Sequence, residues 1–321
     1  MKESRKVVLI GTGMVGMSMA FSLINTGGID ELVLIDIDKE KAKGEAMDLN
    51  HGLPYSENYI EIKYGSYYDC NNADIIVLCA GANQKEGETR LDLVKTNTRI
   101  IQNICKEIKK TCFNGIIIVA SNPVDILSYV VYKVTEYDYH KIIGSGTLLD
   151  TARLRYLLGE FLNISTEDVH AYILGEHGDT SFVSWSNCYV GCKPLLEYID
   201  EKKLDMDDLA DIYDDVKNAA YDIISMKKAT YYGIGLALNK LVLSIFNNAK
   251  NILCVSAYQK NEYGINDIYI GTPCIIDRNG IREIVKLPLN NVDNEKMKKS
   301  YDVLKQIKLE IKKEISNWNF F

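Results

Sequence analysis

Short apolar runs alternate with amphipathic stretches through the first half of the chain. The helical patterns cover residues 39–49 and 91–110, and the apolar runs cover residues 7–10, 32–35, 74–80, 116–120 and 141–144. A run that is apolar at every position suits a strand buried on both faces of a parallel sheet. Because helical stretches separate these strands, the pattern predicts right-handed crossovers and a doubly wound parallel α/β sheet.

The second half has a different pattern, with longer helical stretches first and short strands afterwards. The expected helices are residues 150–162, 207–224 and 227–247, and the expected strands are residues 169–174, 252–257, 268–276 and 281–287. Turn-forming residues at 271–273 and 278–280 punctuate the last strands, which predicts an antiparallel sheet in a mixed α+β domain. A final helix carries one apolar stripe, made of Met297, Tyr301, Leu304, Ile307, Ile311 and Ile315.

Three glycines follow the first apolar run at G-x-G-x-x-G spacing. Gly11 permits a tight turn, Gly13 lets a pyrophosphate approach the backbone, and Gly16 lets the following helix pack close to the strand. Asp36 ends the next strand, where a carboxylate can bind the adenosine ribose of NAD and repel the 2′-phosphate of NADP. The glycines alone fit an ordinary strand–helix turn. Together with the strand, the helix and Asp36, they predict a Rossmann-type NAD-binding domain.

Length and composition are those of an ordinary globular protein. With 321 residues the chain can form two domains or one large α/β unit. There is no obvious linker, and we expect two domains, at residues 1–145 and 146–321. The net charge of −7 argues against a nucleic-acid or anionic-membrane partner. No signal peptide or membrane span is expected, so the eight scattered cysteines are interpreted as reduced thiols of a cytoplasmic protein, with no metal site.

Two groups of residues in the second half can carry chemistry. His177 lies between glycines after a predicted strand, where its ring is free to meet a ligand and exchange a proton at neutral pH. Asp150 and Arg153 share one helix face, so the carboxylate could orient an imidazole and the guanidinium could bind a carboxylate. From spacing alone, a surface histidine and a local surface ion pair remain the plainer interpretations.

The segment after the third apolar run is the other candidate. Gly81 and Ala82 are small and would let the backbone lie against a ligand at the carboxyl edge of the sheet. Residues 83–90 are polar, include a glycine and lack apolar periodicity. They form either a solvated surface loop or a lid over the cofactor.

These motifs together resemble the bacterial L-lactate dehydrogenases over nearly the whole chain. Glu86 is a departure, because relatives commonly have proline there. The resemblance rests on motifs in the same order along the chain, namely residues 11–16, Asp36, and residues 46–52, 84–90, 121–125, 149–153, 175–179 and 229–233.

The resemblance implies hydride transfer between NADH and pyruvate, giving (S)-lactate. His177 would give a proton to the substrate oxygen while Asp150 holds its ring. Arg153 would bind the substrate carboxylate, and Arg90 would polarise the carbonyl. The remaining substrate contacts are expected at Gln84, Asn122 and Thr230, and the remaining cofactor contacts at Val15, Lys41, Gly81, Ala82, Asn122 and Ser145. It also implies a cis bond before Pro123.

Regulation and assembly follow from two further residues. Arg155 lies about 200° around the helix from Arg153, and His170 lies at the start of the strand that leads to His177. By themselves they suit a solvated arginine and an ordinary strand histidine. Relatives activated by fructose 1,6-bisphosphate have an arginine and a histidine at these positions, which implies a homotetramer that binds this effector across a two-fold axis.

Other functions remain open at this point. Malate dehydrogenase has the same fold, but its substrate has a second carboxylate for which the neutral Gln84 offers no counter-charge. Lys85 is adjacent and keeps that alternative open. A non-catalytic NAD-binding protein would have no use for His177, Asp150, Arg90 and Arg153 together, and a nucleoside- or methyl-donor-binding transferase would not explain the histidine loop.

Overall fold

In the computed structural model, residues 4–82 and 90–314 are described, and one large sheet runs through them. Its strands lie in the order β14-β13-β12-β6-β5-β4-β1-β2-β3. The six strands of the first half are parallel to one another, as the apolar runs predicted. They are β1 (Lys6–Ile10), β2 (Glu31–Ile35), β3 (Glu61–Tyr64), β4 (Ile75–Leu78), β5 (Ile116–Val119) and β6 (Ile142–Gly144).

Helices cover both faces of this sheet. Along β1, Val7 and Leu9 pack on the side of α1 and α8, whereas Val8 and Ile10 pack on the side of α3 and α4. Every residue of the strand is buried, which explains why the run is apolar at consecutive positions. The helices of the first half are α1 (Met14–Thr26), α2 (Lys39–Gly52), α3 (Arg90–Lys109) and α4 (Val124–Thr135).

The antiparallel strands of the second half extend this same sheet instead of forming a separate one. Ser256 of β12 (Asn251–Lys260) lies opposite Gly144 of β6 in an antiparallel pair. The expected strand 268–276 is confirmed as β13 (Asn266–Asp277), and the turn-forming residues 271–273 make no turn, because they pair with β12 within this strand. Pro273 has no N–H to donate, but its carbonyl accepts from the backbone of Val285 beyond β14 (Gly280–Ile284).

The expected strand 169–174 is two strands in different sheets. β7 (Val169–His170) pairs with β10 (Tyr189–Val190), and β8 (Ile173–Leu174) pairs with β9 (Phe182–Val183). The expected helix 227–247 begins later, because Lys228 ends the preceding helix in the left-handed conformation at φ 72°. The remaining elements are α5 (Leu148–Leu162), β11 (Lys193–Pro194), α6 (Leu195–Lys202), α7 (Asp208–Lys227), α8 (Tyr232–Phe246) and α9 (Asn291–Glu314). Short 3-10 helices lie at Leu53–Tyr55, Tyr67–Asn72, Tyr139–Lys141, Thr166–Asp168, Trp185–Asn187 and Glu262–Gly264.

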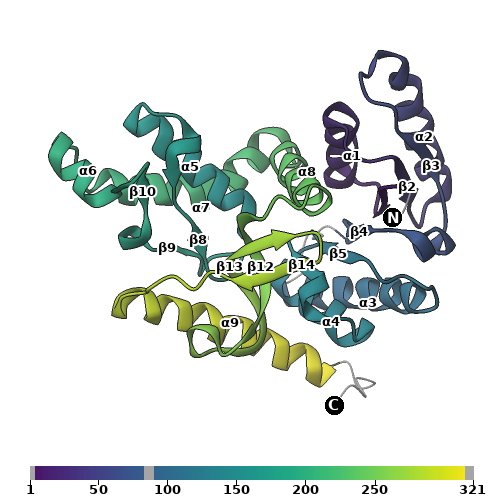
Figure 1. The fold of residues 1–321 in the computed structure, drawn as a ribbon. Helices are drawn as coiled ribbons and strands as arrows, with labels where there is room; N and C mark the ends of the chain where they lie inside the picture. Colours follow the sequence, from purple (N-terminus) through teal and green to yellow (C-terminus); the bar gives the residue numbers. More distant parts are fainter. Residues whose placement is uncertain (1–3, 83–89, 315–321) are drawn as a thin grey trace.

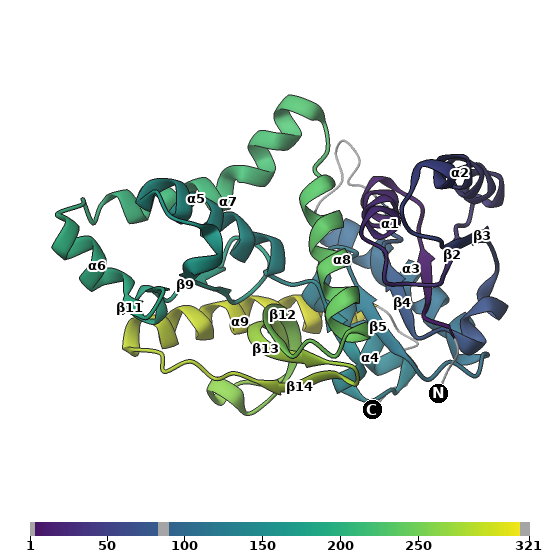
Figure 2. The same cartoon turned by 45° about the horizontal axis from the view of Figure 1, so that its top comes forward.

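The two halves of the chain meet along the sheet. Figure 1 shows α1, α2, β2 and β3 at one end of the molecule, α5, α6 and α7 at the other, and β12 to β14 between them. Viewed from the tilted direction, α8 crosses from the second half toward α1 (Figure 2). The position of the domain boundary at residue 145 stays a prediction.

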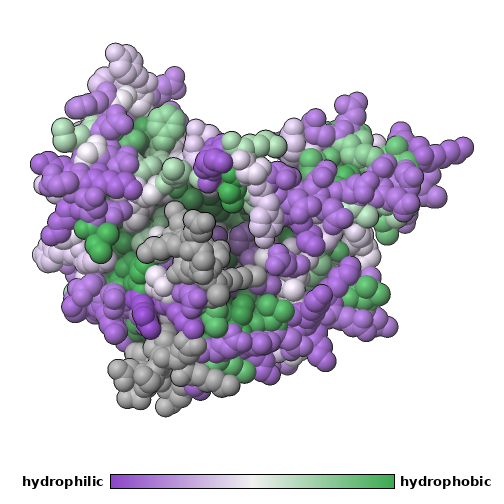
Figure 3. Space-filling model, turned by 180° about the vertical axis from the view of Figure 1, so that it is seen from behind, coloured by the Kyte–Doolittle hydropathy of each residue, from purple (hydrophilic) through white to green (hydrophobic). Residues whose placement is uncertain are grey.

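The last helix packs as its apolar stripe predicted. Met297, Leu304 and Ile311 of α9 are buried, and Tyr301 and Ile307 pack against the same cluster. Ile315 lies outside the described residues. Figure 3 shows hydrophobic patches set among hydrophilic residues on the face seen from behind. In residues 4–82 and 90–314, no helix is long and apolar enough to cross a membrane.

Candidate active site

The glycine loop between β1 and α1 forms an open cradle at the carboxyl edge of the sheet. Gly11 adopts φ +104°, and a Cβ on it would lie 2.5 Å from the nitrogen of Ala80. A Cβ on Gly16 would lie 2.3 Å from the carbonyl oxygen of Gly11, so this position also excludes a side chain. Gly13 faces open space, with nothing within 4 Å of a Cβ. The free N–H groups of the first turn of α1 therefore remain accessible to an anionic group.

Asp36 lies beside this cradle at the end of β2. Its carboxylate accepts hydrogen bonds from the backbone N–H of Thr12 at 2.7 Å, the Thr12 hydroxyl at 2.9 Å and the Asp38 N–H at 3.0 Å. Burial acts against the charged form, but these hydrogen bonds and the charge of Lys41 together lower the pKa of Asp36. The carboxylate is thus ionised at neutral pH and only partly buried.

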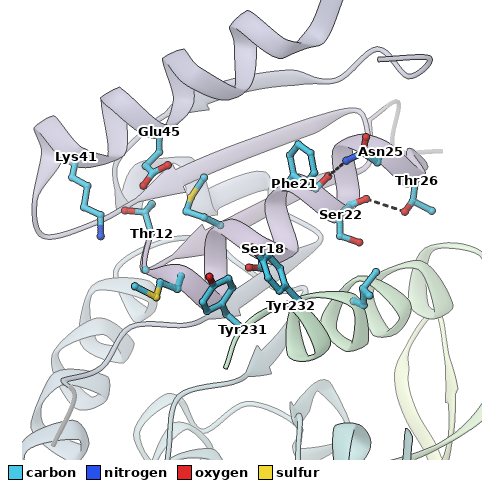
Figure 4. A pocket seen from close by; sticks show the side chains of 14 residues that line it. Thr12, Ser18, Phe21, Ser22, Asn25, Thr26, Lys41, Glu45, Tyr231 and Tyr232 are labelled. Atoms are coloured by element: carbon cyan, nitrogen blue, oxygen red, sulfur yellow. Dashed lines mark hydrogen bonds between the residues drawn. The ribbon is translucent and has the colours of Figure 1, made fainter. Parts of the chain in front are cut away.

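A groove of about 700 Å³ adjoins the cradle. It lies between α1, α2 and the start of α8, with Lys41 and Glu45 on one side and Tyr231 and Tyr232 on the other (Figure 4). Several of its apolar side chains are largely exposed, namely Met14, Phe21, Tyr232 and Leu236. The groove is therefore more apolar than an ordinary surface depression.

The other residues predicted to contact the cofactor follow neighbouring strands. Gly81 and Ala82 come after β4, Asn122 comes after β5, and Ser145 comes directly after β6. Because β4, β5 and β6 are adjacent and parallel, these residues lie side by side at one edge of the sheet. Val15 lies in the first turn of α1, and Ser145 is buried with its N–H bonded to the carbonyl of Val119.

A buried amide connects two of these loops, although no motif in the sequence marks it. Asn97 of α3 is 2% exposed. Its Oδ1 accepts from the N–H of Ala82 at 2.7 Å, and its Nδ2 donates to the carbonyl of Asn122 at 2.8 Å. Asn97 therefore holds the end of β4 against the end of β5. Nothing distinguishes it in the sequence, since it is one polar position of an amphipathic helix.

The predicted catalytic residues of the second half come together in space. The ring Nδ1 of His177 lies 2.7 Å from Oδ2 of Asp150, and Nη1 of Arg153 lies 3.0 Å from Oδ1 of the same carboxylate. Asp150 and Arg153 lie one helical turn apart on α5, while His177 comes from the loop after β8. The alternative that Asp150 and Arg153 form a local surface ion pair is therefore wrong, because their side chains are only 14% and 16% exposed.

These three side chains line a cavity of about 430 Å³. Asn122 and Pro123 enter it from the end of β5, and the peptide bond between them is cis, as expected. Apolar walls come from α3 and α7, and Lys217 of α7 adds a cation that the sequence reasoning did not select. The apolar lining residues are Leu93, Val94, Val216, Ala220 and Ile224.

Electrostatics in this cavity favour a charged ring on His177. Burial alone would lower its pKa, but the charge of Asp150 and its hydrogen bond, with help from Asp125, raise the pKa of His177 above the usual value. Burial likewise acts against ionised Asp150, yet His177 and Arg153 lower the pKa of that carboxyl. The pair therefore favours imidazolium beside carboxylate, with the proton available on the ring nitrogen that faces away from Asp150.

Not every predicted site residue reaches this cavity. Thr230 is half-buried in the link between α7 and α8 and does not line it. Gln84, Lys85 and Glu86 lie outside the described residues, and so does the side chain of Arg90, whose backbone begins α3. Arg155 and Arg153 make different contacts, as the helical spacing predicted. The Nε of Arg155 donates to the carbonyl of Ala171 at 3.0 Å, and its guanidinium lies 4.8 Å from the ring centre of Tyr172.

Comparison with protein families assigns both halves of the chain. Residues 5–144 match the lactate/malate dehydrogenase NAD-binding domain, and residues 147–315 match the lactate/malate dehydrogenase α/β C-terminal domain. An L-lactate dehydrogenase of Macrococcus caseolyticus is 48% identical over 305 residues, covering 95% of this chain and 97% of its own. L-lactate dehydrogenase 1 of Peribacillus psychrosaccharolyticus is 49% identical over 307 residues, covering 95% of this chain and 96% of its own.

Solved structures agree with this assignment. A lactate dehydrogenase from a Medee basin deep-sea metagenome library superposes with a TM-score of 0.94 at 50% identity, covering 96% of this chain and 99% of its own. The minor L-lactate dehydrogenase of Enterococcus mundtii in its ligands-bound form also gives a TM-score of 0.94, at 46% identity and with coverage of 96% and 99%. The chain therefore belongs to the lactate/malate dehydrogenase family, among the bacterial L-lactate dehydrogenases, and is an NAD-dependent oxidoreductase.

Proposed function

We propose that the protein interconverts pyruvate and (S)-lactate, with His177 as the proton donor and acceptor. The observation that carries this proposal is the group formed by His177, Asp150 and Arg153 beside Asn122 in one cavity. A 2-oxo acid needs both a cation for its carboxylate and an acid for its carbonyl oxygen, and this group offers both.

The residues around the glycine loop fit the family's cofactor. A side chain at Gly11 or Gly16 would collide with backbone, whereas the space beside Gly13 is open for a pyrophosphate. Ionised Asp36 suits the ribose hydroxyls, and Asn122 and Ser145 come from the strands that would lie along the nicotinamide half. When bound as NADH, the cofactor supplies the hydride for the carbonyl carbon.

Proton transfer in this mechanism belongs to the chain itself. The protonated ring of His177 donates to the substrate oxygen as negative charge develops there, and it takes the proton back in the reverse reaction. Asp150 bonds to ring Nδ1, so it orients the ring and leaves the other nitrogen to act on the substrate. Its charge also stabilises the imidazolium, consistent with the raised pKa of His177.

Substrate binding is assigned to side chains around this group. Arg153 uses one nitrogen on Asp150 and keeps further N–H donors for a bidentate contact with the substrate carboxylate. Asn122 lines the same cavity, and we assign it a hydrogen bond to the substrate oxygen. By resemblance, we add Arg90 as the group that polarises the carbonyl, Gln84 beside the substrate methyl, and Thr230 as a further substrate contact.

The test compares two substrates by following NADH absorbance. We expect rapid oxidation of NADH with pyruvate and little with oxaloacetate. A preference for oxaloacetate would assign malate dehydrogenase activity instead, with Lys217 in the cavity as a counter-charge for the second carboxylate. No turnover with either substrate, despite tight NADH binding, would favour a non-catalytic protein.

We further propose that fructose 1,6-bisphosphate activates the enzyme through Arg155 and His170. Arg155 reaches the backbone of Ala171, next to His170, so the two side chains come from one small region. His170 is exposed on β7, and Arg155 is half-buried on α5, the helix that carries Asp150 and Arg153. An anion bound there would act on the elements that carry the catalytic residues.

The effector should lower KM for pyruvate in dilute wild-type enzyme at neutral pH. Arg155→Gln should remove this response and keep the activity measured at saturating pyruvate, because Arg155 makes no contact with the His177 cavity. Arg278→Gln, at an exposed position in the turn before β14, serves as the matched control and should keep the response. Identical saturation curves with and without millimolar effector would contradict the proposal.

A homotetramer is proposed as the assembled form. Met14 and Phe21 of α1, with Tyr232 and Leu236 of α8, leave apolar side chains exposed at more than half their surface along one groove. Such patches are typical of surfaces that become covered on association. Sedimentation velocity should give a tetramer, with dissociation favoured by dilution and opposed by the effector.

A further inference from the structure

A buried carboxylate outside the predicted site lies against the loop of His177. Asp125 is in the first turn of α4, just after Pro123, and is 2% exposed. Its Oδ2 accepts from the backbone N–H of His177 at 2.8 Å, and its Oδ1 accepts from the hydroxyl of Ser256 on β12. One side chain therefore joins α4, the catalytic loop and the central sheet.

We propose that Asp125 is a positioning residue for the reaction, which fixes the backbone of His177 and stabilises the protonated form of its ring. The inference rests on the proposed function, in which His177 gives and takes the proton. Asp150 holds the ring from one side, and Asp125 holds the backbone of the same residue from another element. The catalytic histidine would then depend on two carboxylates, of which only one contacts its ring.

Asp125 differs from Asp150 in how its charge is balanced. Asp150 is paired with the cationic Arg153. The hydrogen bonds that Asp125 accepts come from an amide and a hydroxyl, both neutral. Among the described side chains, the charged groups around His177 are Asp150 and Arg153 of α5, Glu176 and Asp179 of its own loop, Lys217 of α7, and Asp125.

Titration of the two groups is consistent with this role. Burial raises the pKa of Asp125 to about 6, although Ser256, the His177 N–H and the charge of His177 act to lower it. With this pKa, Asp125 is mostly ionised at neutral pH. Its negative charge is one of the groups that raise the pKa of His177.

Asp125→Asn removes the charge while keeping an oxygen for the His177 N–H. The measurement is kcat/KM against pH in both directions, for pyruvate with NADH and for lactate with NAD. Pyruvate reduction needs the protonated ring and lactate oxidation the neutral ring. In the two pH profiles, we expect the alkaline limb of reduction and the acid limb of oxidation to move together to lower pH. The expected shift is roughly one unit, at the low end of the range for the loss of a nearby opposite charge. The plateau of reduction at low pH should stay within a few-fold.

Ser256→Ala is a second variant that leaves the carboxylate in place. Without the hydroxyl, the pKa of Asp125 should rise and its charge should be partly lost where His177 titrates. The alkaline limb of reduction and the acid limb of oxidation should then move to lower pH, by less than in Asp125→Asn. If Asp125→Asn does not fold, this variant decides the question alone.

A purely structural role predicts a different result, namely lower rates at every pH with both midpoints in the wild-type position. That result in the folded variants would overturn the inference and leave the proposed function intact. If the wild-type protein itself does not reduce pyruvate, the proposed function fails first. NADH affinity, measured by fluorescence titration, should stay within a few-fold in both variants, because the glycine loop and Asp36 follow β1 and β2, whereas Asp125 is on α4 and Ser256 is on β12.

Discussion

Replacing His177 with asparagine is expected to lower kcat for pyruvate reduction by roughly 10²- to 10⁴-fold, the range that a general acid contributes. An asparagine amide can still donate to Asp150, so the local geometry is kept, but it has no proton to give at neutral pH. NADH should bind nearly as tightly, because the glycine loop and Asp36 follow other strands. Steady-state rates at saturating pyruvate and a fluorescence titration of NADH measure the two effects.

The pH dependence follows from the same group. Because the charge and hydrogen bond of Asp150 raise the pKa of His177 despite burial, pyruvate reduction should fall only as pH rises through that raised pKa. Lactate oxidation needs the neutral ring and should fall as pH drops through the same pKa. His140→Asn is the matched control, since this ring bonds to Asp138 and lies outside the cavity. A fully active His177→Asn protein would refute the assignment.

Gln84→Arg is expected to change the ratio of kcat/KM for pyruvate over oxaloacetate by about 100-fold or more, toward oxaloacetate. Burying the second carboxylate of oxaloacetate without a counter-charge costs several kcal/mol, and an arginine at this position would supply that charge. Gln84 lies outside the described residues, so this prediction rests on the family resemblance. The measurement is kcat/KM for both substrates in both proteins.

Two control variants separate charge from position. Gln84→Met has a similar length and no charge, so it should keep the preference for pyruvate. Lys85→Ala tests whether the neighbouring lysine already contributes to any activity with oxaloacetate. An unchanged ratio in Gln84→Arg would mean that this side chain does not face the substrate.

The fold of the first half could be predicted from the sequence, because strands buried on both faces are apolar at consecutive positions. Every residue of β1 is buried, so its apolar run is continuous, and the G-x-G-x-x-G spacing marks where the chain turns into α1. Asp36, the parallel strand pairs and the helices between them follow from the same short-range pattern. β3 was not predicted, because this edge strand is short and alternates in burial.

The fold of the second half was harder to predict, because its strands form only where the chain pairs with segments that are distant in the sequence. Nothing within residues 169–174 indicates that β7 and β8 belong to different sheets. The glycine and proline at 271 and 273 normally indicate a turn, yet they lie in β13, held between β12 and β14. Only the pair between Ser256 and Gly144 shows that one sheet spans both halves of the chain.

The same distinction between local pattern and tertiary contact applies to the site. The sequence by itself determined which side chains can bind a dinucleotide, donate a proton and hold a carboxylate, because those properties belong to the residue and its immediate neighbours. The tertiary structure decided that His177 meets Asp150, that Asn97 joins the ends of β4 and β5, and that buried Asp125 holds the backbone of His177. Those contacts join positions from 15 to 52 residues apart, and their strength comes from burial, which no local pattern encodes.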